Sequence, residues 1–263
     1  MPHDLDLPRL GPYVIRGELQ PGRLGARWLA VNEQPDTAHV LHRLRCPRDA
    51  AGQRRLLMAV EAVAALRHAH VLPIESFRID ADIWLCLITP YTGDASGAMT
   101  LDRLAALKGG QMDASEVRRL LLQLLSASAF SHAHGLVHGR LGLSEVLVDR
   151  RGSVLIELYG LGPRMRGLDH AADGLVRAEV RSIVGQAYQL LTGLMPLTPV
   201  VAATRVVRGL DAAWDEFFRA GLDERTGGFG SAARALGAVP ERAPEVIVRR
   251  SWLRGAIRRV LRG

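Results

Sequence analysis

The spacing of apolar residues changes once along this chain, close to residue 91, and this change constrains the fold more than any other feature. Before residue 91, short apolar segments bounded by turn residues predict strands. One helix is predicted among them, over residues 50–67, where apolar residues recur at helical spacing. The predicted strands cover residues 13–31, as two strands around Pro21-Gly22, and residues 39–43, 71–79 and 83–89.

After a turn-rich segment at residues 92–100, helical periodicity dominates. Residues 145–149 and 153–159 are the exception, because they flank Arg151-Gly152 and predict a hairpin. The order of strands first and helices afterwards predicts an α+β fold in two lobes. The predicted helices cover residues 116–134, with Ser115 as the N-terminal cap, and residues 178–191, 212–220 and 231–236.

The composition is that of an ordinary globular protein. Of 263 residues, 48% are apolar and 23% are charged, and no apolar run approaches the ~18 residues of a membrane-spanning helix. The N-terminal sequence lacks the pattern of a signal peptide, and Cys46 and Cys86 form no disulfide framework or metal-type pair. We therefore expect a cytoplasmic protein. The net charge is +7, and Lys108 is the only lysine.

Three segments resemble the protein kinase superfamily, especially its bacterial Ser/Thr kinases. Residues 134–162 are similar to the catalytic loop, hairpin and metal-binding turn, residues 179–193 to the helix that anchors the large lobe, and residues 66–74 to the end of the αC helix and the next strand. The resemblance implies a bilobal kinase-like fold with a strand-rich N-lobe and a helical C-lobe. Its expected parts are an N-terminal tail (1–12), the N-lobe (13–92), the C-lobe (93–240) and a basic amphipathic helix (241–263).

The resemblance also indicates where a nucleotide would lie, and the residues there depart from the family pattern. The glycine-rich loop falls on Gln20, Gly22 and Gly25, so one glycine is missing, and Arg23 lies in the turn. Arg27 replaces the apolar residue that packs on adenine, so its side chain would have to swing out to admit a base. The vestigial nucleotide cleft implied by the resemblance comprises Gly22, Gly25, Arg27, Val40, Thr89 and Leu147.

Phosphoryl transfer needs a phosphate-binding lysine, metal ligands and a base near the acceptor hydroxyl. At the matching positions, His42 replaces the lysine, Ala59 replaces its glutamate partner and Arg140 replaces the base. The guanidinium of Arg140 has no atom that can accept a proton. Glu145 replaces the metal-binding asparagine, and Leu158 replaces the metal-binding aspartate. Glu61 lies on another helix face than Ala59, and strand alternation predicts that Glu157 points the opposite way to Leu158. These substitutions predict no cofactor, no metal and no enzymatic activity: a pseudokinase.

The scaffold positions of the family are retained. Val63, Ile74, His138 and Tyr159 fall where the family stacks an apolar spine through both lobes. Glu179 replaces the buried aspartate of the large helix, so we expect its carboxylate to accept backbone N–H groups near the catalytic loop. Between Gly160 and Glu179 the segment is short and has no Ala-Pro-Glu motif, so the substrate-docking platform is expected to be missing.

Several other features have a structural interpretation beside a functional one. His132, His134 and His138 could suggest a metal site, but structural roles are favoured because two of them match family positions. Cys86 is expected in the core. Arg140 could bind an anion, or it could be a solvated arginine that points outward.

The C-terminal segment, residues 241–263, predicts a helix with one apolar face and one basic stripe. Four destinations stay open for it: its own domain, which is favoured, an anionic membrane surface contacted through residues 246–262, a protein partner, or nucleic acid, the least favoured. The apolar face comprises Trp252, Leu253, Ala256, Ile257, Val260 and Leu261, and the stripe comprises Arg250, Arg254, Arg258 and Arg262.

Three functions follow as hypotheses. The first is a pseudokinase that acts as a protein-binding scaffold or allosteric regulator of another protein, either a kinase or its substrate. The second is a divergent phosphotransferase with residual activity that uses Glu145 for metal. The third is a basic surface-binding module, cytoplasmic or at the inner membrane face, in which the kinase-like domain carries the C-terminal helix.

Overall fold

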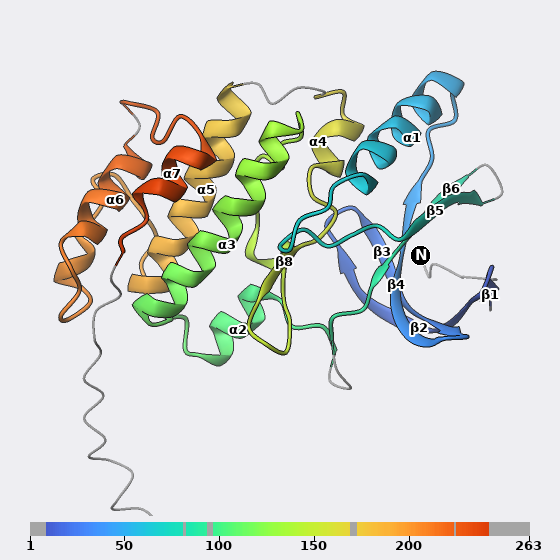
Figure 1. Ribbon diagram of the computed structural model, residues 1–263, viewed down its shortest axis with the longest axis horizontal. Coiled ribbons are helices and arrows are strands. Elements are labelled where there is room, and N and C mark those ends of the chain that lie inside the picture. The colour runs from blue at the N-terminus through green and yellow to red at the C-terminus, as the bar shows by residue number, and fades with distance from the viewer. Residues whose placement is uncertain (1–8, 81–82, 94–96, 169–172, 224, 242–263) are drawn as a thin grey trace, which may run out of the picture.

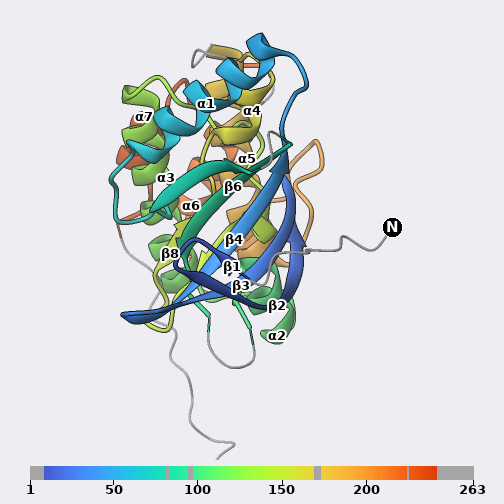
Figure 2. The same cartoon turned by 90° about the vertical axis from the view of Figure 1, so that its right-hand side faces the viewer.

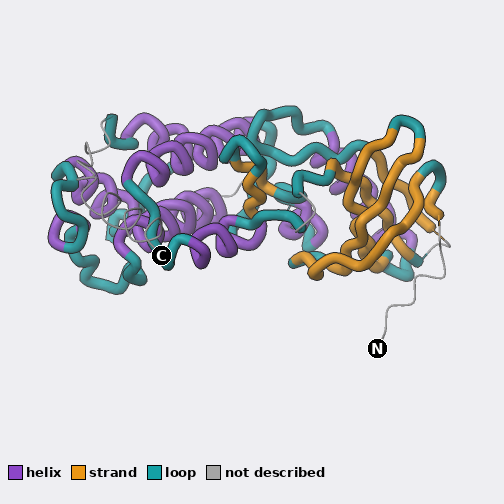
Figure 3. Tube along the Cα trace, turned by 90° about the horizontal axis from the view of Figure 1, so that it is seen from below, coloured by secondary structure: helices purple, strands orange, loops and turns teal. Residues whose placement is uncertain are grey.

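The computed structural model describes residues 9–80, 83–93, 97–168, 173–223 and 225–241. A sheet with one helix forms one lobe, and the remaining helices form the other (Figure 1). Figure 3 shows the same division, with strands gathered at one end of the molecule and helices at the other. The α+β, two-lobed fold predicted from the sequence is confirmed. Apart from Glu241, the predicted C-terminal helix lies outside the described residues.

The N-lobe is a six-stranded antiparallel sheet with the order β1-β2-β3-β4-β6-β5. In Figure 2 the sheet curls beneath helix α1. β6 lies inside the sheet and its residues 85–89 are all buried, which explains its continuous apolar run. The N-lobe elements are β1 (Arg9–Leu10), β2 (Tyr13–Gly22), β3 (Gly25–Glu33), β4 (Asp36–Arg45), α1 (Ala50–Ala64), β5 (Ser76–Asp80) and β6 (Trp84–Pro90).

Three details of the N-lobe differ from the sequence prediction. The first turn is Arg23-Leu24 and not Pro21-Gly22, because β2 runs to Gly22. β1 falls inside the predicted N-terminal tail. The strand predicted over 71–79 begins only at Ser76, because Val71 pairs instead with Ile156 of the C-lobe, where the Leu72 N–H donates to the Ile156 carbonyl at 2.9 Å.

The C-lobe is helical apart from one short hairpin, as predicted. The N-terminal cap of α3 is Asp113 and not Ser115, because Asp113 and Glu116 form a reciprocal capping box. Helices α2 and α4 are too short for their periodicity to stand out in the sequence. The C-lobe elements are α2 (Leu101–Leu107), α3 (Ala114–Ala133), η1 (Leu143–Glu145), β7 (Val146–Val148), β8 (Val154–Ile156), α4 (Leu161–Met165), α5 (Asp173–Thr192), η2 (Ala203–Arg205), α6 (Ala213–Leu222) and α7 (Ala232–Ala238).

One apolar core runs through both lobes. It extends from Leu85 and Leu87 of the sheet, past α1, to the helices around α5. A second, smaller cluster that includes Trp28 and Cys86 covers the other face of the sheet, so Cys86 is a core residue. None of the helices in the described part of the chain is long and apolar enough to cross a bilayer. The shared core places the sheet and the C-lobe hairpin on opposite sides of one interlobe cleft.

Candidate functional site: the interlobe cleft

The hairpin of β2 and β3 sends Arg27 across the cleft. The Arg27 Nε donates to the Gln20 carbonyl at 2.8 Å, and its Nη1 lies 2.9 Å and 3.0 Å from the two carboxylate oxygens of Glu157. The hairpin also lies very close to β4, because a Cβ on Gly25 would come within 2.6 Å of the Arg43 carbonyl oxygen. A glycine is therefore required there, and the guanidinium of Arg27 is held in a fixed place.

Glu157 points into the cleft, and the prediction that it points the opposite way to Leu158 is wrong. β8 ends at Ile156, so strand alternation no longer sets the direction of the next two side chains, and both line the cleft. Leu158 has a positive φ of 47°, which turns the backbone. Burial raises the pKa of the Glu157 carboxyl, and the charge and hydrogen bond of Arg27 oppose this effect.

A second arginine of the hairpin contacts a second C-lobe carboxylate. The Arg23 Nη1 lies 2.9 Å from Oε2 of Glu145 and donates to the Arg140 carbonyl at 3.1 Å. The same Glu145 oxygen accepts the Gly142 N–H at 2.8 Å. The oxygens that could have served a metal are thus occupied by protein donors. We call these two pairs, Arg23–Glu145 and Arg27–Glu157, the arginine clamp.

His42, at the position of the family's lysine, is a buried neutral group. Its Nε2 lies 2.9 Å from the Thr89 hydroxyl, and only 3% of the residue is exposed. Burial first, and then the charge of Arg27, lower its pKa to about 3. It therefore carries no charge at neutral pH, and its 3.9 Å approach to Glu157 is no ion pair. Ala59 is buried and offers no carboxylate, while Glu61 is exposed on another face of α1, as expected.

The cavity between the β2–β3 hairpin and the C-lobe side of the cleft is small in this conformation. The space lined by Gly25, His42, Glu145, Glu157 and Leu158 measures about 20 Å³, about one water, whereas small-molecule sites typically measure ~300–1,000 Å³. Val40, Thr89 and Leu147, expected around an adenine, are all buried by protein. At the metal position, Leu158 offers no ligand atom. The residues of the closed cleft therefore do not fit magnesium and nucleotide.

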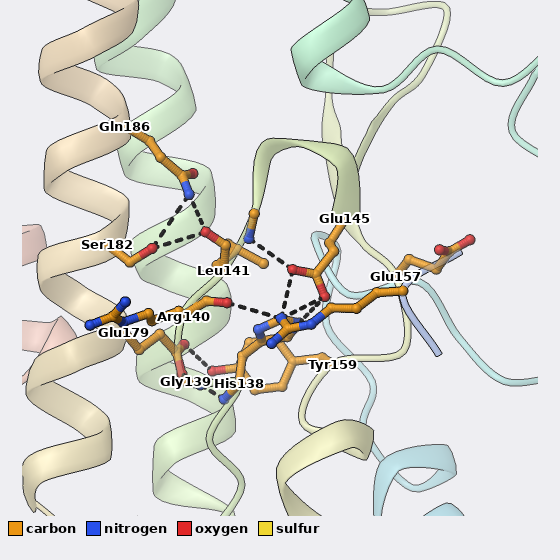
Figure 4. Close-up of polar contacts among 12 residues, drawn as sticks. His138, Gly139, Arg140, Leu141, Glu145, Glu157, Tyr159, Glu179, Ser182 and Gln186 are labelled. Atoms are coloured by element: carbon orange, nitrogen blue, oxygen red, sulfur yellow. Dashed lines mark hydrogen bonds and ion pairs between the residues drawn. The ribbon is translucent and has the colours of Figure 1, made fainter. Parts of the chain in front are cut away.

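Beneath the cleft, Glu179 of α5 organises the loop that carries Arg140 (Figure 4). Its Oε2 accepts the backbone N–H groups of His138 and Gly139 at 2.6 Å and 3.0 Å, and its Oε1 accepts the Tyr159 hydroxyl proton. Burial alone would raise the pKa of Glu179, but the His132 ring 3.3 Å away, the nearby His138 and the Tyr159 hydrogen bond lower it. Glu179 thus makes the backbone contacts expected of it.

The residues predicted to form a spine lie in the shared core. Val63, Ile74 and Tyr159 belong to the same apolar cluster, and the His138 ring meets the Tyr159 ring edge to face at 5.5 Å. The three histidines of the proposed cluster diverge. His132 approaches Glu179 at 3.3 Å, while His134 is exposed and bonds the Phe130 carbonyl. Within the described ranges no three His, Cys, Asp or Glu side chains converge as metal ligands would.

The family resemblance placed most of these residues in the cleft, but the arginine clamp was not predicted. A metal at Glu145 was expected only in the phosphotransferase alternative, Glu157 was predicted to point the opposite way to Leu158, and no partner was indicated for Arg23. The available signal was the pairing of two arginines in one glycine-rich hairpin with two glutamates at metal-ligand positions. Arg140, in place of the base, is exposed and points toward α5, away from Glu145 and Glu157 (Figure 4).

Comparisons with known proteins show what this chain is similar to. No family model matches the chain. Over 158 residues the chain is 30% identical to CBL-interacting protein kinase 4 of Oryza sativa subsp. japonica, which covers 59% of this chain and 34% of that protein. It is 29% identical over 119 residues to serine/threonine-protein kinase PLK4 of Nematostella vectensis (45% of this chain, 12% of that protein). It is 27% identical over 157 residues to sucrose non-fermenting protein kinase 1 of Fusarium virguliforme (58% and 21%).

These names correct one prediction. The chain spans about a third of the length of the first two curated relatives that it matches, 34% and 33%. All of the relatives described above are named protein kinases, and this contradicts the prediction that the chain is not an enzyme. That prediction rested on the residues His42, Ala59, Arg140, Glu145 and Leu158 taken together.

Proposed function

This chain belongs to the protein kinase superfamily, and we propose that it works as a protein-binding scaffold or allosteric regulator of another protein. The observation that supports this proposal is the arginine clamp across a cleft of about 20 Å³. The clamp joins the two lobes at the place where a nucleotide would otherwise separate them. The two lobes then present one continuous surface to a partner.

The burial of the clamp supports a stable, closed arrangement. Only 12% of the Arg27 side chain and 8% of the Glu157 side chain are exposed, so water and salt screen this pair weakly. The Arg23–Glu145 pair lies at the cleft mouth, where 47% of the Arg23 side chain is exposed, and it contributes less. A regulator of this kind would change its partner surface when the inner pair separates.

Phosphoryl transfer is the second candidate function, and the names of the relatives favour it. The cavity at the clamp measures only about 20 Å³, so phosphates could enter there only if the lobes part and both clamp pairs separate. The two functions therefore require different states of the arginine clamp: one requires the pairs to be formed and the other requires them to be separated. Binding to a partner is compatible with the closed cleft, whereas phosphoryl transfer is not.

Affinity capture with the full chain from its native host tests the proposal. We expect a protein that is enriched over a bead control, that forms a complex with the purified chain, and whose own activity changes in that complex. In parallel, the purified chain is incubated with magnesium and radiolabelled ATP, alone and with the captured protein. Phosphate incorporation without any complex that survives purification would overturn the proposal in favour of phosphoryl transfer.

A further inference from the structure

The connection between α5 and α6 exposes many apolar side chains. Of the nine large apolar side chains that are exposed in the described part of the chain, five lie between residues 194 and 206. Leu197 is 73% exposed and Met195 is 62% exposed. Exposed apolar side chains gathered in one segment are typical of a surface that another segment or molecule covers. We call this surface the α5–α6 apolar patch, and its members are Leu194, Met195, Leu197, Val201 and Val206.

The backbone that carries the patch is fastened to both helices. The Tyr188 hydroxyl of α5 donates to the Val201 carbonyl at 2.9 Å. The Asp215 carboxylate of α6 accepts the backbone N–H of Thr204 at 3.1 Å and its hydroxyl proton at 2.6 Å. Ala203, between these two contacts, is buried in the C-lobe core. A surface held in this way loses little conformational freedom when another segment packs on it.

A groove with a largely apolar lining adjoins the patch. It measures about 590 Å³, and Val201 of the patch lines it together with Val200 and Ala202. Phe218 and Leu222 of α6, both buried, also line it. This volume lies in the range of small-molecule sites, so the groove has room for one large apolar side chain such as an indole ring.

The described chain ends close to the start of the α5–α6 connection. Near the start of α3, the Arg118 Nε donates to the Pro240 carbonyl at 2.6 Å. The end of α5 lies at the same place, because the Gln111 amide just before α3 donates to the Thr192 carbonyl at 2.7 Å. Figure 1 shows α3, α5 and α7 packed side by side. Residues 242–263 are therefore tethered at the end of the C-lobe where the patch begins.

We infer that residues 252–261 bind across the α5–α6 apolar patch of the same chain, with Trp252 in the adjoining groove. The sequence predicts a helix here whose apolar side chains recur on one face from Trp252 to Leu261. Two apolar surfaces then cover one another, and the basic stripe of the segment stays in water. The C-terminal segment is thus a cover for an interaction surface. This inference does not depend on the proposed function, because it holds for a scaffold and for a phosphotransferase alike.

The tether favours this occupant over a second copy of the chain or a membrane. Residues 242–251 can span roughly 33 Å when extended, which is about the length of the 20-residue helix α5. A short tether gives the segment an effective concentration on the order of millimolar, above the concentration of a second copy in dilute solution. An anionic membrane would cover the apolar face of the segment but would leave the α5–α6 apolar patch exposed.

Hydrogen–deuterium exchange of the full chain, read by mass spectrometry, tests the inference. We expect the amides of residues 252–261 to exchange at least about tenfold more slowly than in a free peptide of the same sequence, because a packed helix opens rarely. Met195→Asp/Leu197→Asp places two charges in the patch and should abolish this protection. Trp252→Asp should abolish it from the other side of the contact.

Met58→Asp on α1, where the side chain is 57% exposed outside the patch, is the matched control and should keep the wild-type protection. Thermal melting shows whether each variant is folded; if the patch variant is not, Trp252→Asp decides. Protection that is absent from the wild type, that survives the patch variant, or that Met58→Asp reduces equally would overturn the inference. So would protection that appears only at higher protein concentration, which indicates a second copy, or only with phosphatidylserine vesicles, which indicates a membrane.

Discussion

Arg27 of the N-lobe and Glu157 of the C-lobe lie 2.9 Å apart, with 12% and 8% of their side chains exposed. They are separated by 130 residues in sequence. A buried ion pair of this kind joins the lobes through both charge and hydrogen bonds, and neither partner can be removed without leaving the other in a poorly solvated place. The behaviour of the cleft therefore depends on whether this contact is kept.

Removal of the cation should destabilise the protein strongly at neutral pH. In Arg27→Met, Glu157 stays buried without its partner, and we expect a loss of about 3–5 kcal/mol in the free energy of unfolding. The pKa of Glu157 is already raised and rises further without Arg27. A carboxyl with a raised folded pKa binds more protons in the folded state, so the variant should regain stability as the pH falls toward the ordinary value of 4.5.

Urea denaturation of both proteins across pH 4 to 8 measures this effect. The double variant Arg27→Met/Glu157→Leu removes both charges and should recover most of the loss, because no charge is left buried. If Arg27→Met unfolds at the wild-type urea concentration at every pH, the pair is solvated and the clamp does not join the lobes.

Nucleotide should leave the melting temperature of the wild-type protein unchanged. The closed cleft measures about 20 Å³, and its two carboxylates are bound by arginines, so neither phosphate nor metal finds a place. A ligand at a hundred times its Kd would add about 2.7 kcal/mol to the unfolding free energy, which is readily detected. The measurement is a thermal-shift titration to millimolar ATP. A saturable rise with magnesium would contradict the prediction, and a rise only without magnesium would indicate metal-free binding.

Glu179 should stabilise the protein through the loop that it binds. Glu179→Ala leaves the N–H groups of His138 and Gly139 without an acceptor, and we expect a loss of roughly 1–3 kcal/mol. Arg140→Ala, which removes an exposed side chain from the same loop, should be nearly neutral and is the control. Chemical denaturation compares the two. A Glu179→Ala midpoint equal to that of the wild type would show that water satisfies these donors.

The contribution of Glu179 to the stability of the protein should depend on pH. The pKa of Glu179 is lowered in the folded protein, so its contribution is full above the ordinary value of 4.5 and is lost as the pH falls below it. Glu179→Gln cannot titrate, so its unfolding free energy should fall less steeply than that of the wild type below pH 4.5. Parallel curves for the two proteins would contradict the lowered pKa.

His42 should make the protein less stable in acid. Its folded pKa is about 3 and its ordinary value is 6.5, so between these values the unfolded chain binds the extra proton. Stability therefore rises with pH through this window, by up to about 4 kcal/mol for a shift of this size. His42→Gln keeps a hydrogen-bonding group for Thr89 and cannot titrate, so its stability should vary less between pH 4 and 6.5. NMR titration of the imidazole gives the pKa directly, and a value near 6.5 would refute the prediction.

The local pattern of apolar and turn residues was sufficient to predict most of the helices and strands. Alternation and turn residues predicted the strands, and helical periodicity predicted α3 and α5, because both patterns follow from the geometry of one element. The strand predicted from Val71 was wrong because that residue pairs with Ile156, a contact that local pattern does not contain. The predicted backbone contacts of Glu179 needed the family resemblance, since His138 lies 41 residues away in the chain.

By itself the sequence determined the α+β order of the chain and most of its helices and strands, since these depend on residue identity and local geometry. Only the tertiary structure decided where Arg23, Arg27, Glu145 and Glu157 point. Their pairings join residues 122 and 130 positions apart, and the direction of Glu157 depends on where β8 ends. Charge and burial act through space, so the lowered pKa of His42 exists only once the folded chain buries its ring and places Arg27 near it.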